Sequence, residues 1–386
     1  MKNRYIELHT LTAYPPSNLN RDDTGQPKTV KIGNAQRLRA SSQCLKSAWR
    51  KSSEFQECLS DNLGTRTKKL GADIYQKCVD GGITHKNAID LTLSILEPFG
   101  KTVAATISEK KSKPKKEVAE ENSNETNKIL PTDEKIQQEI ETLKLEQLVF
   151  FDVEELKNIN TIVERSIETK KKPTKEEIAN LLCGSSRSVD IALWGRMLTS
   201  PKAPNIEAAC QVSHSFSVHS AIVEDDYFTA VDDLNSDNTK GAAHLGENGY
   251  AAGLFYLYVV INTEILINNL GGDLELAKKA IAKVVTAIAT VSPTGKQNSY
   301  GSQVYASYIL AEVGNSQPRS LSVAFLKPID YNIRGSIDFG KVAVDALDKQ
   351  CTYFDKVYGD HADKTYIINT FEGTGELKEL ISMVIE

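Results

Sequence analysis

The chain has 386 residues, of which 40% are hydrophobic and 25% charged, and its formal net charge is −5 at neutral pH. This is the composition of an ordinary globular protein, and the length fits one large domain with insertions or two domains. The longest apolar stretch, Ala251 to Ile261, is far shorter than the roughly 20 residues of a membrane span, and MKNRYIELHT lacks a signal core. We expect a cytoplasmic protein without membrane contact.

The six cysteines lie far apart and form no CxxC pair. They are typical of reduced cytosolic thiols and predict neither a disulfide framework nor a zinc site. We expect no cofactor and no bound metal. The acidic net charge also argues against a protein that coats nucleic acid over its whole surface, so any such binding must be local.

The first predicted element is a strand from Tyr5 to Thr12. Ile6 and its alternate neighbours form one face, while Tyr5, Glu7 and His9 form the other, which is the period of a half-buried strand. Tyr14-Pro-Pro-Ser-Asn should end it, because neither proline can donate to a strand ladder.

The next segment, Asn20 to Lys51, concentrates positive charge in an otherwise acidic chain. It holds eight Lys or Arg residues against two Asp. A local field of that sign favours an anionic partner. We expect a flexible Gly- and Lys-containing loop that leads into a helix from about Ser42 to Leu59.

That predicted helix has two unlike sides. Cys44, Leu45, Ala48 and Trp49 form the apolar side, whereas Gln43, Lys46 and Arg50 share the polar side through their i, i+3, i+7 spacing. Ser41 or Ser42 is a good N-cap, and a helix N-terminus receives phosphate oxygens well. The segment therefore predicts a site that grips a nucleic-acid backbone, with a solvated amphipathic helix and basic loop as the alternative.

A large, mostly helical insertion follows over residues 62–185, with a low-complexity, mixed-charge tract at 107–128. Beyond it, strands are predicted at Ser188–Leu198, Gln211–Ile222, Ala251–Asn262, Gln303–Leu310 and Leu321–Leu326. Helices are predicted at Leu274–Val291, after an Asp273 cap, and at Ile337–Tyr358.

In their regular parts, these elements follow the β-α-β-β-α-β order of the ferredoxin-like split motif, which also forms the RRM platform. We therefore expect an α+β fold with a ferredoxin-like (RRM-like) sheet. The aromatic RNP signature is missing, so this order predicts a fold and not an RRM mode of binding.

Several motifs in order carry a family resemblance: LNRDDTGQPK, QRLRASSQCLKSAWR, DIALWGRMLTS, HSFSVHSA, DDYFTAVDDL, GAAHLGENGYAAGLFYLYVVIN and Thr294-Gly-Lys-Gln297. Together they resemble the CasC backbone subunit of Cascade, the type I-E CRISPR surveillance complex, over about Arg4 to Tyr300. The resemblance implies a hand-shaped subunit. Residues 1–61 and 186–386 would form the palm, residues 62–185 the helical fingers, and a β-hairpin at about 198–250 the thumb.

The resemblance also implies a function in antiviral defence. Copies of such a subunit polymerise along one crRNA guide and, with other Cascade subunits, hold its spacer for pairing with target DNA. By resemblance, Arg21, Lys28, Ser41, Gln43, Lys46 and Arg50 would contact the guide backbone. The charge argument adds Lys31, Arg37 and Arg39 to the RNA-binding set.

A second set of residues is implied by the resemblance alone. Met197, Tyr227, Phe228 and Val231 would wedge into the guide–target duplex, where an apolar side chain can unstack a base step. The alternative for Tyr227 and Phe228 is packing inside the hairpin. Within the insertion, Lys110 to Lys116 would either touch target DNA or belong to a solubilising tether, which we favour.

Catalytic chemistry is not expected. Asp22-Asp23, Asp225-Asp226 and Asp232-Asp233 could suggest a two-metal nuclease, but adjacent strand residues face opposite ways. We expect Asp22-Asp23 to order the basic loop through ion pairs. Subunits of related type III complexes cut RNA through a loop Asp, so a metal-dependent endoribonuclease that uses Asp22 or Asp23 is the alternative function.

The histidines suggest no site either. His214, His219 and His244 lack the spacing of a metal triad, and we expect them to be structural. Gly241 to Gly246 lacks the context of a phosphate-binding loop. The sequence as a whole predicts a non-catalytic RNA-binding subunit.

Overall fold

The computed structural model describes residues 3–112, 132–200, 204–230, 244–330 and 338–386. It divides the chain into two compact units. The first comprises Met1–Ser60, Ala209–Ile267 and Asp273–Glu386, and the second comprises Asp61–Ala208 and Asn268–Gly272. Among the described residues, no helix combines the length and the apolarity needed to span a bilayer.

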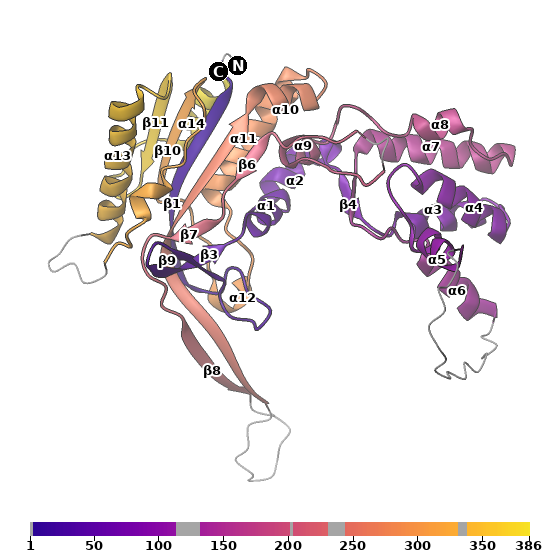
Figure 1. Cartoon of the computed structure of the whole chain (residues 1–386), viewed down its shortest axis with the longest axis horizontal. Coiled ribbons are helices and arrows are strands. Elements are labelled where there is room, and N and C mark those ends of the chain that lie inside the picture. Colours follow the sequence, from indigo (N-terminus) through magenta and orange to yellow (C-terminus); the bar gives the residue numbers. More distant parts are fainter. Residues whose placement is uncertain (1–2, 113–131, 201–203, 231–243, 331–337) are drawn as a thin grey trace, which may run out of the picture. The chain divides into compact units, whose positions relative to one another are not determined.

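The first unit is built on a large antiparallel sheet (Figure 1). Its strands follow the order β11-β10-β1-β9-β7-β3-β2, and β6 and β8 also pair with β9. They are β1 (Tyr5–Ser17), β2 (Thr29–Ile32), β3 (Ala35–Ala40), β6 (Cys210–Val212), β7 (Ser215–Ser217), β8 (Glu224–Ala230), β9 (His244–Asn262), β10 (Tyr308–Gly314) and β11 (Lys364–Asn369). The prediction of a mixed fold with helices and an antiparallel sheet is confirmed.

Strand β1 lies in the middle of this sheet and pairs with both β9 and β10. Two expectations for it were wrong. The strand continues through Pro15 and Pro16 to Ser17, with a shift of register against β9 that accommodates the prolines. Its polar face is not solvated either, because Glu7 and His9 are as buried as Ile6.

The buried titratable groups of β1, Glu7 and His9, face partners. Glu7 accepts a hydrogen bond from the Tyr258 hydroxyl at 2.5 Å and forms an ion pair with His361 at 2.6 Å. His9 lies 3.2 Å from a carboxylate oxygen of Glu312. Buried charged groups remain stable only when they are paired in this way. A hydrophobic pattern therefore underestimated how much of β1 the helices and loops cover.

Figure 1 shows α13 on one side of the sheet and α11 and α14 on the other. The helices of this unit are α1 (Ser42–Arg50), α2 (Ser53–Leu59), α11 (Leu274–Thr290), α12 (Gln297–Tyr300), α13 (Phe339–Tyr358) and α14 (Leu377–Ile385), together with the 3-10 helix η2 (Ser322–Phe325). Helix α10 (Thr263–Asn269) follows β9 at the boundary of the two units. Asp273 caps α11 by accepting from the N–H of Leu276, as expected.

The predicted helix from Ser42 to Leu59 is two helices. The Ser52 hydroxyl accepts from the N–H of Phe55 at 3.3 Å and so caps a new helix, α2. A second helix therefore begins at Ser53, where the sequence pattern alone predicted one continuous helix. Predicted helices at α11 and α13 and the central strand β9 are confirmed.

Other strand predictions were wrong or shifted. Ser188–Leu198 contains helix α9 (Val189–Trp194), and Leu321–Leu326 contains η2. Val189 to Leu193 are all buried, and a short run buried on every side has no period that separates strand from helix. Gln211–Ile222 splits into β6 and β7, and β10 begins only at Tyr308.

The second unit is mostly helical and has its own apolar core, which includes Ile74, Leu91, Ile95, Phe99 and Phe151. Its elements are η1 (Ser60–Asn62, at its start), α3 (Leu70–Asp80), α4 (His85–Leu96), α5 (Val103–Ser112), α6 (Thr132–Thr142), α7 (Val153–Thr169), α8 (Lys175–Ala179) and α9, with a small sheet of β4 (Thr65–Thr67) and β5 (Val149–Phe151). Most of the tract from Lys110 to Lys116 lies outside the described residues.

Candidate nucleic-acid interface

The basic segment of the first unit is a folded hairpin and not the flexible loop that the sequence suggested. Strands β2 and β3 pair from Thr29↔Leu38 to Ile32↔Ala35. At the turn, Gly33 has φ +60°, and a side chain there would come within 2.4 Å of the Leu326 carbonyl oxygen. Only glycine fits this position, so the hairpin is held against the segment after η2.

The loop before the hairpin is closed by backbone hydrogen bonds. The N–H of Lys28 donates to the carbonyl of Asn20, and the N–H of Arg39 donates to the carbonyl of Lys28, both at 2.8 Å. These two bonds connect Asn20, Lys28 and Arg39, which are distant along the chain. The side chains of Lys28 and Arg39 line one shallow hollow.

Asp22 orders the tip of this loop through hydrogen bonds, where ion pairs were expected. One carboxylate oxygen accepts from the Thr24 hydroxyl at 2.8 Å, the Thr24 N–H at 2.9 Å and the Gln26 N–H at 3.0 Å. The bond from the Thr24 hydroxyl is the main cause that holds the pKa of Asp22 below its ordinary value. Asp23 is exposed.

Helix α1 starts at a capped N-terminus. Ser41 accepts from the Cys44 N–H at 3.3 Å, while its own N–H donates to the side-chain oxygen of Asn20 at 3.0 Å. The Ser41 hydroxyl is thus used inside the helix, and the residue is only 8% exposed. What the site can offer a ligand here is the positive end of the helix, because no acidic residue lies in the first turn.

The apolar side of α1 is buried through Leu45, Ala48 and Trp49. On the other side, Gln43 is exposed and Lys46 and Arg50 are partly exposed. The charge of Lys46 also affects the Cys210 thiol at the start of β6. Burial raises the pKa of the Cys210 thiol at the start of β6 to about 12, and the charge of Lys46 partly offsets that rise.

Arg39 and His214 bring β3 and the β6–β7 connection together. An Arg39 guanidinium N–H points at Nδ1 of His214 at 2.6 Å. Burial lowers the pKa of His214, and the positive charges of Arg39 and Lys28 lower it further. A neutral ring that accepts from Arg39 leaves the surface positive. His214 was expected to be only structural, and no sequence motif linked it to the basic segment.

Arg37 does not belong to this surface, contrary to expectation. Its side chain is fully buried, and its guanidinium donates to the carbonyl oxygens of Ser217 at 3.0 Å and Phe325 at 2.8 Å. The reason is that η2 covers the part of β3 that carries Arg37. Arg37 is a structural residue of the large sheet, whereas Arg21 and Lys31 are exposed.

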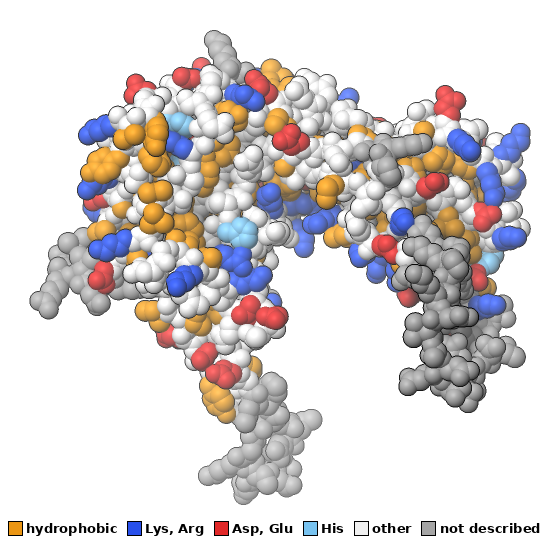
Figure 2. All heavy atoms as spheres, in the orientation of Figure 1, with side chains coloured by type: hydrophobic (Ala, Val, Ile, Leu, Met, Phe, Trp, Pro, Cys, Tyr) orange, Lys and Arg blue, Asp and Glu red, His pale blue; other side chains and the backbone are white. Residues whose placement is uncertain are grey.

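We call Lys28, Arg39, Lys46, Arg50 and the capped start of α1 the basic surface. Figure 2 shows Lys and Arg side chains gathered over α1 and the adjoining N-terminal segment. The cations come from a loop, a strand and a helix, so no short motif describes the surface. Flexible basic side chains beside a helix N-terminus suit an anion of extended shape more than a single small ligand.

The β8–β9 hairpin and the segment Thr294–Gln297 adjoin this surface. Asn18 donates to the carbonyls of Gly25 at 2.9 Å and Gly249 at 2.8 Å. Lys296 donates to the side-chain oxygen of Asn248, and a side chain at Gly295 would come within 2.3 Å of the Leu19 carbonyl oxygen. The hydrogen bonds of Asn18 and Lys296 and the close approach at Gly295 hold the base of the β8–β9 hairpin beside the basic loop. The sequence did not reveal these contacts.

The aromatic residues of β8 differ in exposure. Tyr227 is 66% exposed, and Phe228 is 39% exposed with its ring lying across Gly246. Tyr227 therefore presents an aromatic face to solvent instead of packing inside the hairpin. Val231, the other residue expected on this hairpin to act as a wedge, lies outside the described residues.

Met197 belongs to the second unit and is 82% exposed. Its neighbour Arg196 is buried and makes a two-pronged ion pair with Glu155, at 2.5 and 2.9 Å. Glu155 also accepts from the Asp152 N–H in the capping box of α7. The backbone next to Met197 is thus held in place by the Arg196–Glu155 ion pair and the capping box of α7.

The remaining histidine candidates are His219 and His244. His219 is buried, with Nδ1 donating to the Ser220 carbonyl and Nε2 accepting from the Leu254 N–H, so it is structural as expected. The side chain of His244 is outside the described set. Within the described ranges, no three His, Cys, Asp or Glu side chains are arranged to hold a metal ion.

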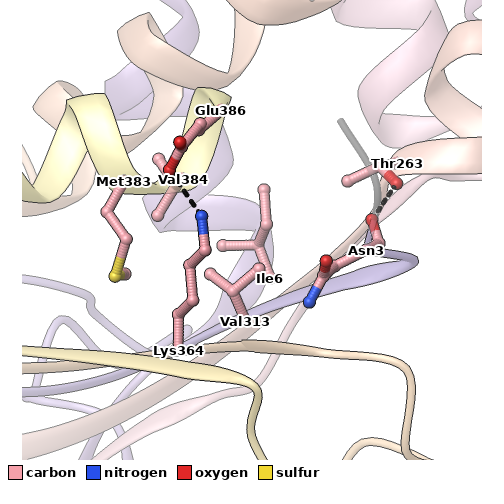
Figure 3. A pocket seen from close by; sticks show the side chains of 8 residues that line it. All are labelled: Asn3, Ile6, Thr263, Val313, Lys364, Met383, Val384 and Glu386. Carbon is pink, nitrogen blue, oxygen red and sulfur yellow. Dashed lines mark hydrogen bonds and ion pairs between the residues drawn. The ribbon is translucent and has the colours of Figure 1, made fainter.

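A separate pocket of about 180 Å³ lies beside α14 and the edge of the sheet (Figure 3). It is lined by apolar residues such as Ile6 and Val313, and by Lys364. The Lys364 ammonium is engaged with Glu386 at 2.5 Å. This pocket is lined by none of the residues of the basic surface, and its cation is neutralised.

Comparison with solved structures shows that the fold of this chain is shared. A chain of a "CRISPR RNA-guided surveillance complex, pre-nicking" superposes with a TM-score of 0.73 at 24% identity, over 99% of each chain. A chain of a second "CRISPR RNA-guided surveillance complex" gives 0.56 at 20% identity, over 99% of this chain and 98% of that one. These similarities show a shared fold. No curated protein matches in sequence.

The sequence model of the CT1975-like proteins, a Cas family, matches residues 6–382. This match confirms the resemblance to Cas backbone subunits that the motifs indicated, while the type I-E subtype remains a prediction. The match spans nearly the whole chain, and so the protein belongs to the family of CT1975-like proteins.

Proposed function

We propose that this protein is a crRNA-binding backbone subunit of a CRISPR surveillance complex and holds the guide through its sugar-phosphate strand. The observation that carries the proposal is the basic surface: Lys28 and Arg39 line one hollow, Lys46 and Arg50 share the partly exposed side of α1, and the capped start of α1 holds no acidic residue. Contacts of this kind bind phosphates without reading bases, which suits a guide whose sequence must vary.

Mutation of the basic surface tests this binding. Lys46→Ala should weaken guide binding equally for unrelated sequences and reduce the slope of log affinity against log salt by about 0.7 per lost phosphate contact. Lys341→Ala, on the exposed side of α13, is the charge-matched control. Unchanged affinity and slope in Lys46→Ala would refute the proposal.

We further propose that the first unit is a ferredoxin-like palm. The strands β10-β1-β9-β6, with helices α1 and α11 in the connections, have the order and direction that such a motif requires. The β8–β9 hairpin would then be the thumb and the helical second unit the fingers.

In the complex, copies of the chain would bind side by side along one guide and, with other subunits of a type I-E Cascade, present the spacer to target DNA. A repeated head-to-tail interface gives an open filament whose length the RNA or a capping subunit sets. Mass measurement of the chain with guides of increasing length tests this: the number of bound copies should rise stepwise with length.

We also propose that the subunit is non-catalytic. The support is the position of Asp22, one oxygen of which already accepts three hydrogen bonds within its own loop. The alternative, an endoribonuclease that uses Asp22 or Asp23, predicts discrete RNA fragments in the presence of Mg²⁺. If Asp22→Ala or Asp23→Ala abolished such fragments, the subunit would be an enzyme.

A further inference from the structure

The second unit contains a pocket of about 410 Å³ between helices α4 and α7. Ile83 and Leu91 supply an apolar part, and hydroxyl, amide and ammonium groups supply the rest. None of the described residues that line it is acidic. A pocket of this size that holds ammonium, hydroxyl and amide groups, and no carboxylate among its described lining residues, is suited to an anion.

The first donor group is the start of α4, a helix of 12 residues. Thr84 occupies the N-cap position in an extended conformation, yet its side chain makes no capping hydrogen bond, and the first turn holds no acidic residue. Thr84 and Asn87 both line the pocket. The partial positive charge of this terminus is therefore not compensated by the helix's own residues.

A second and independent observation is the hydroxyl of Ser166 on α7. Ser166 lines the same pocket and is 1% exposed, and its hydroxyl has no hydrogen-bond partner among the described residues. A buried hydroxyl without a partner is costly, and such groups are rare in folded proteins. A ligand oxygen that reached it from the pocket would remove that cost.

The third contribution comes from the lysines after α7. Lys170 is held over the pocket because its ammonium donates to the Gly81 carbonyl at 2.8 Å, and Lys172 pairs with Asp90 at 2.8 Å. Lys171 is exposed between them, and within the described residues it forms no ion pair.

We propose that this pocket binds a phosphate group, with Lys171, Ser166 and the start of α4 as its principal donors. The phosphate would come from a free phosphate compound or from a nucleic-acid backbone. The site goes beyond the proposed guide-binding function, since it lies in the second unit and uses none of the basic surface.

Calorimetric titration of the full chain with inorganic phosphate tests the site. Binding should be detectable, and Lys171→Gln should weaken it at least about fivefold, because an ammonium contact to an anion is lost. Lys157→Gln, which removes an exposed lysine elsewhere on α7, should leave binding unchanged. Guide RNA binding should be the same in all these variants, which separates this site from the basic surface.

Ser166→Ala supplies the decisive comparison. It removes an unpaired buried hydroxyl, so the variant should be at least as stable to heat as the unmodified protein and yet bind phosphate more weakly. Displacement of phosphate by a short oligodeoxynucleotide would identify backbone phosphate as the source, and its absence would identify a free phosphate compound. The proposal would be overturned if the unmodified protein bound no phosphate, or if Ser166→Ala and Lys171→Gln both bound phosphate as tightly as the unmodified protein.

Discussion

The side-chain oxygen of Asn20 accepts a hydrogen bond from the backbone N–H of Ser41 at 3.0 Å. This single contact joins the start of the basic loop to the start of α1, two segments that are 21 residues apart. Because Ser41 in turn caps the helix, the direction of the helix N-terminus and the path of the loop are coupled.

Removal of the Asn20 side chain should therefore loosen both segments. We expect Asn20→Ala to lower the free energy of unfolding by about 1 kcal/mol, the usual effect of losing one hydrogen bond of this kind. RNA affinity should fall as well, although no charge is lost. Urea unfolding and filter binding would measure the two effects, with Asn34→Ala at the exposed β2–β3 turn as the control.

Arg37 and Arg39 should respond in opposite ways. Arg37→Met leaves the carbonyls of Ser217 and Phe325 without their donor in a buried site, and we expect a loss of about 3 kcal/mol of stability. Arg39→Ala should cost little stability and weaken RNA binding about tenfold. Equal stability loss in the two variants, measured by urea unfolding, would contradict the assignment of Arg37 to the interior.

The lowered pKa of His214 has a consequence for pH. Between the ordinary histidine pKa and the lowered value, the unfolded chain binds a proton that the folded chain does not, so stability should fall as the pH decreases through this window. A phosphate placed beside the ring would favour the protonated form, so RNA binding should take up a proton and tighten toward lower pH.

Guide binding measured from pH 7.5 down to pH 6 would check this linkage. His214→Ala should show a weaker pH dependence than the unmodified protein. A pH profile that is identical in both would show that His214 does not sense the bound strand.

Tyr227 should matter for target pairing and not for folding. The side chain is 66% exposed, so Tyr227→Ala should change the free energy of unfolding by no more than about 0.5 kcal/mol. If its ring lies against a base step, the variant should bind guide RNA normally and pair with complementary DNA more weakly. Guide binding and DNA capture measured on one preparation would reveal this split, with Tyr353→Ala on α13 as an exposed aromatic control. Equal DNA capture by both variants would argue against a wedge.

Long, strongly patterned segments were predicted well. Helices α11 and α13 lie where the sequence placed them, because each carries enough apolar residues to define a helical period. The strand predicted at Ala251–Asn262 lies within β9, which begins earlier, at His244. Short segments failed. Val189 to Leu193 of α9 are all buried, so this short run has no period that separates a strand from the helix that it forms.

The candidate site was predicted only in part, because the sequence shows local charge and helical spacing but not contacts between distant residues. Lys28, Lys46 and Arg50 carry charge in a segment without acids, and the helix pattern alone puts Lys46 and Arg50 on one side. The contributions of Asn18, Asn20 and His214 could not be predicted, because each depends on a partner that is distant in sequence or ordinary in composition.

The amino-acid sequence alone determined the sign and place of the charge, the strongest periodic elements and the family motifs, since these depend on local order along the chain. The tertiary structure decided which charges face solvent. Arg37 and Arg39 are two residues apart, yet Arg37 is internal because Phe325, 288 residues farther along, brings its carbonyl to the guanidinium. Burial depends on which distant segment covers a face, and no local pattern records that.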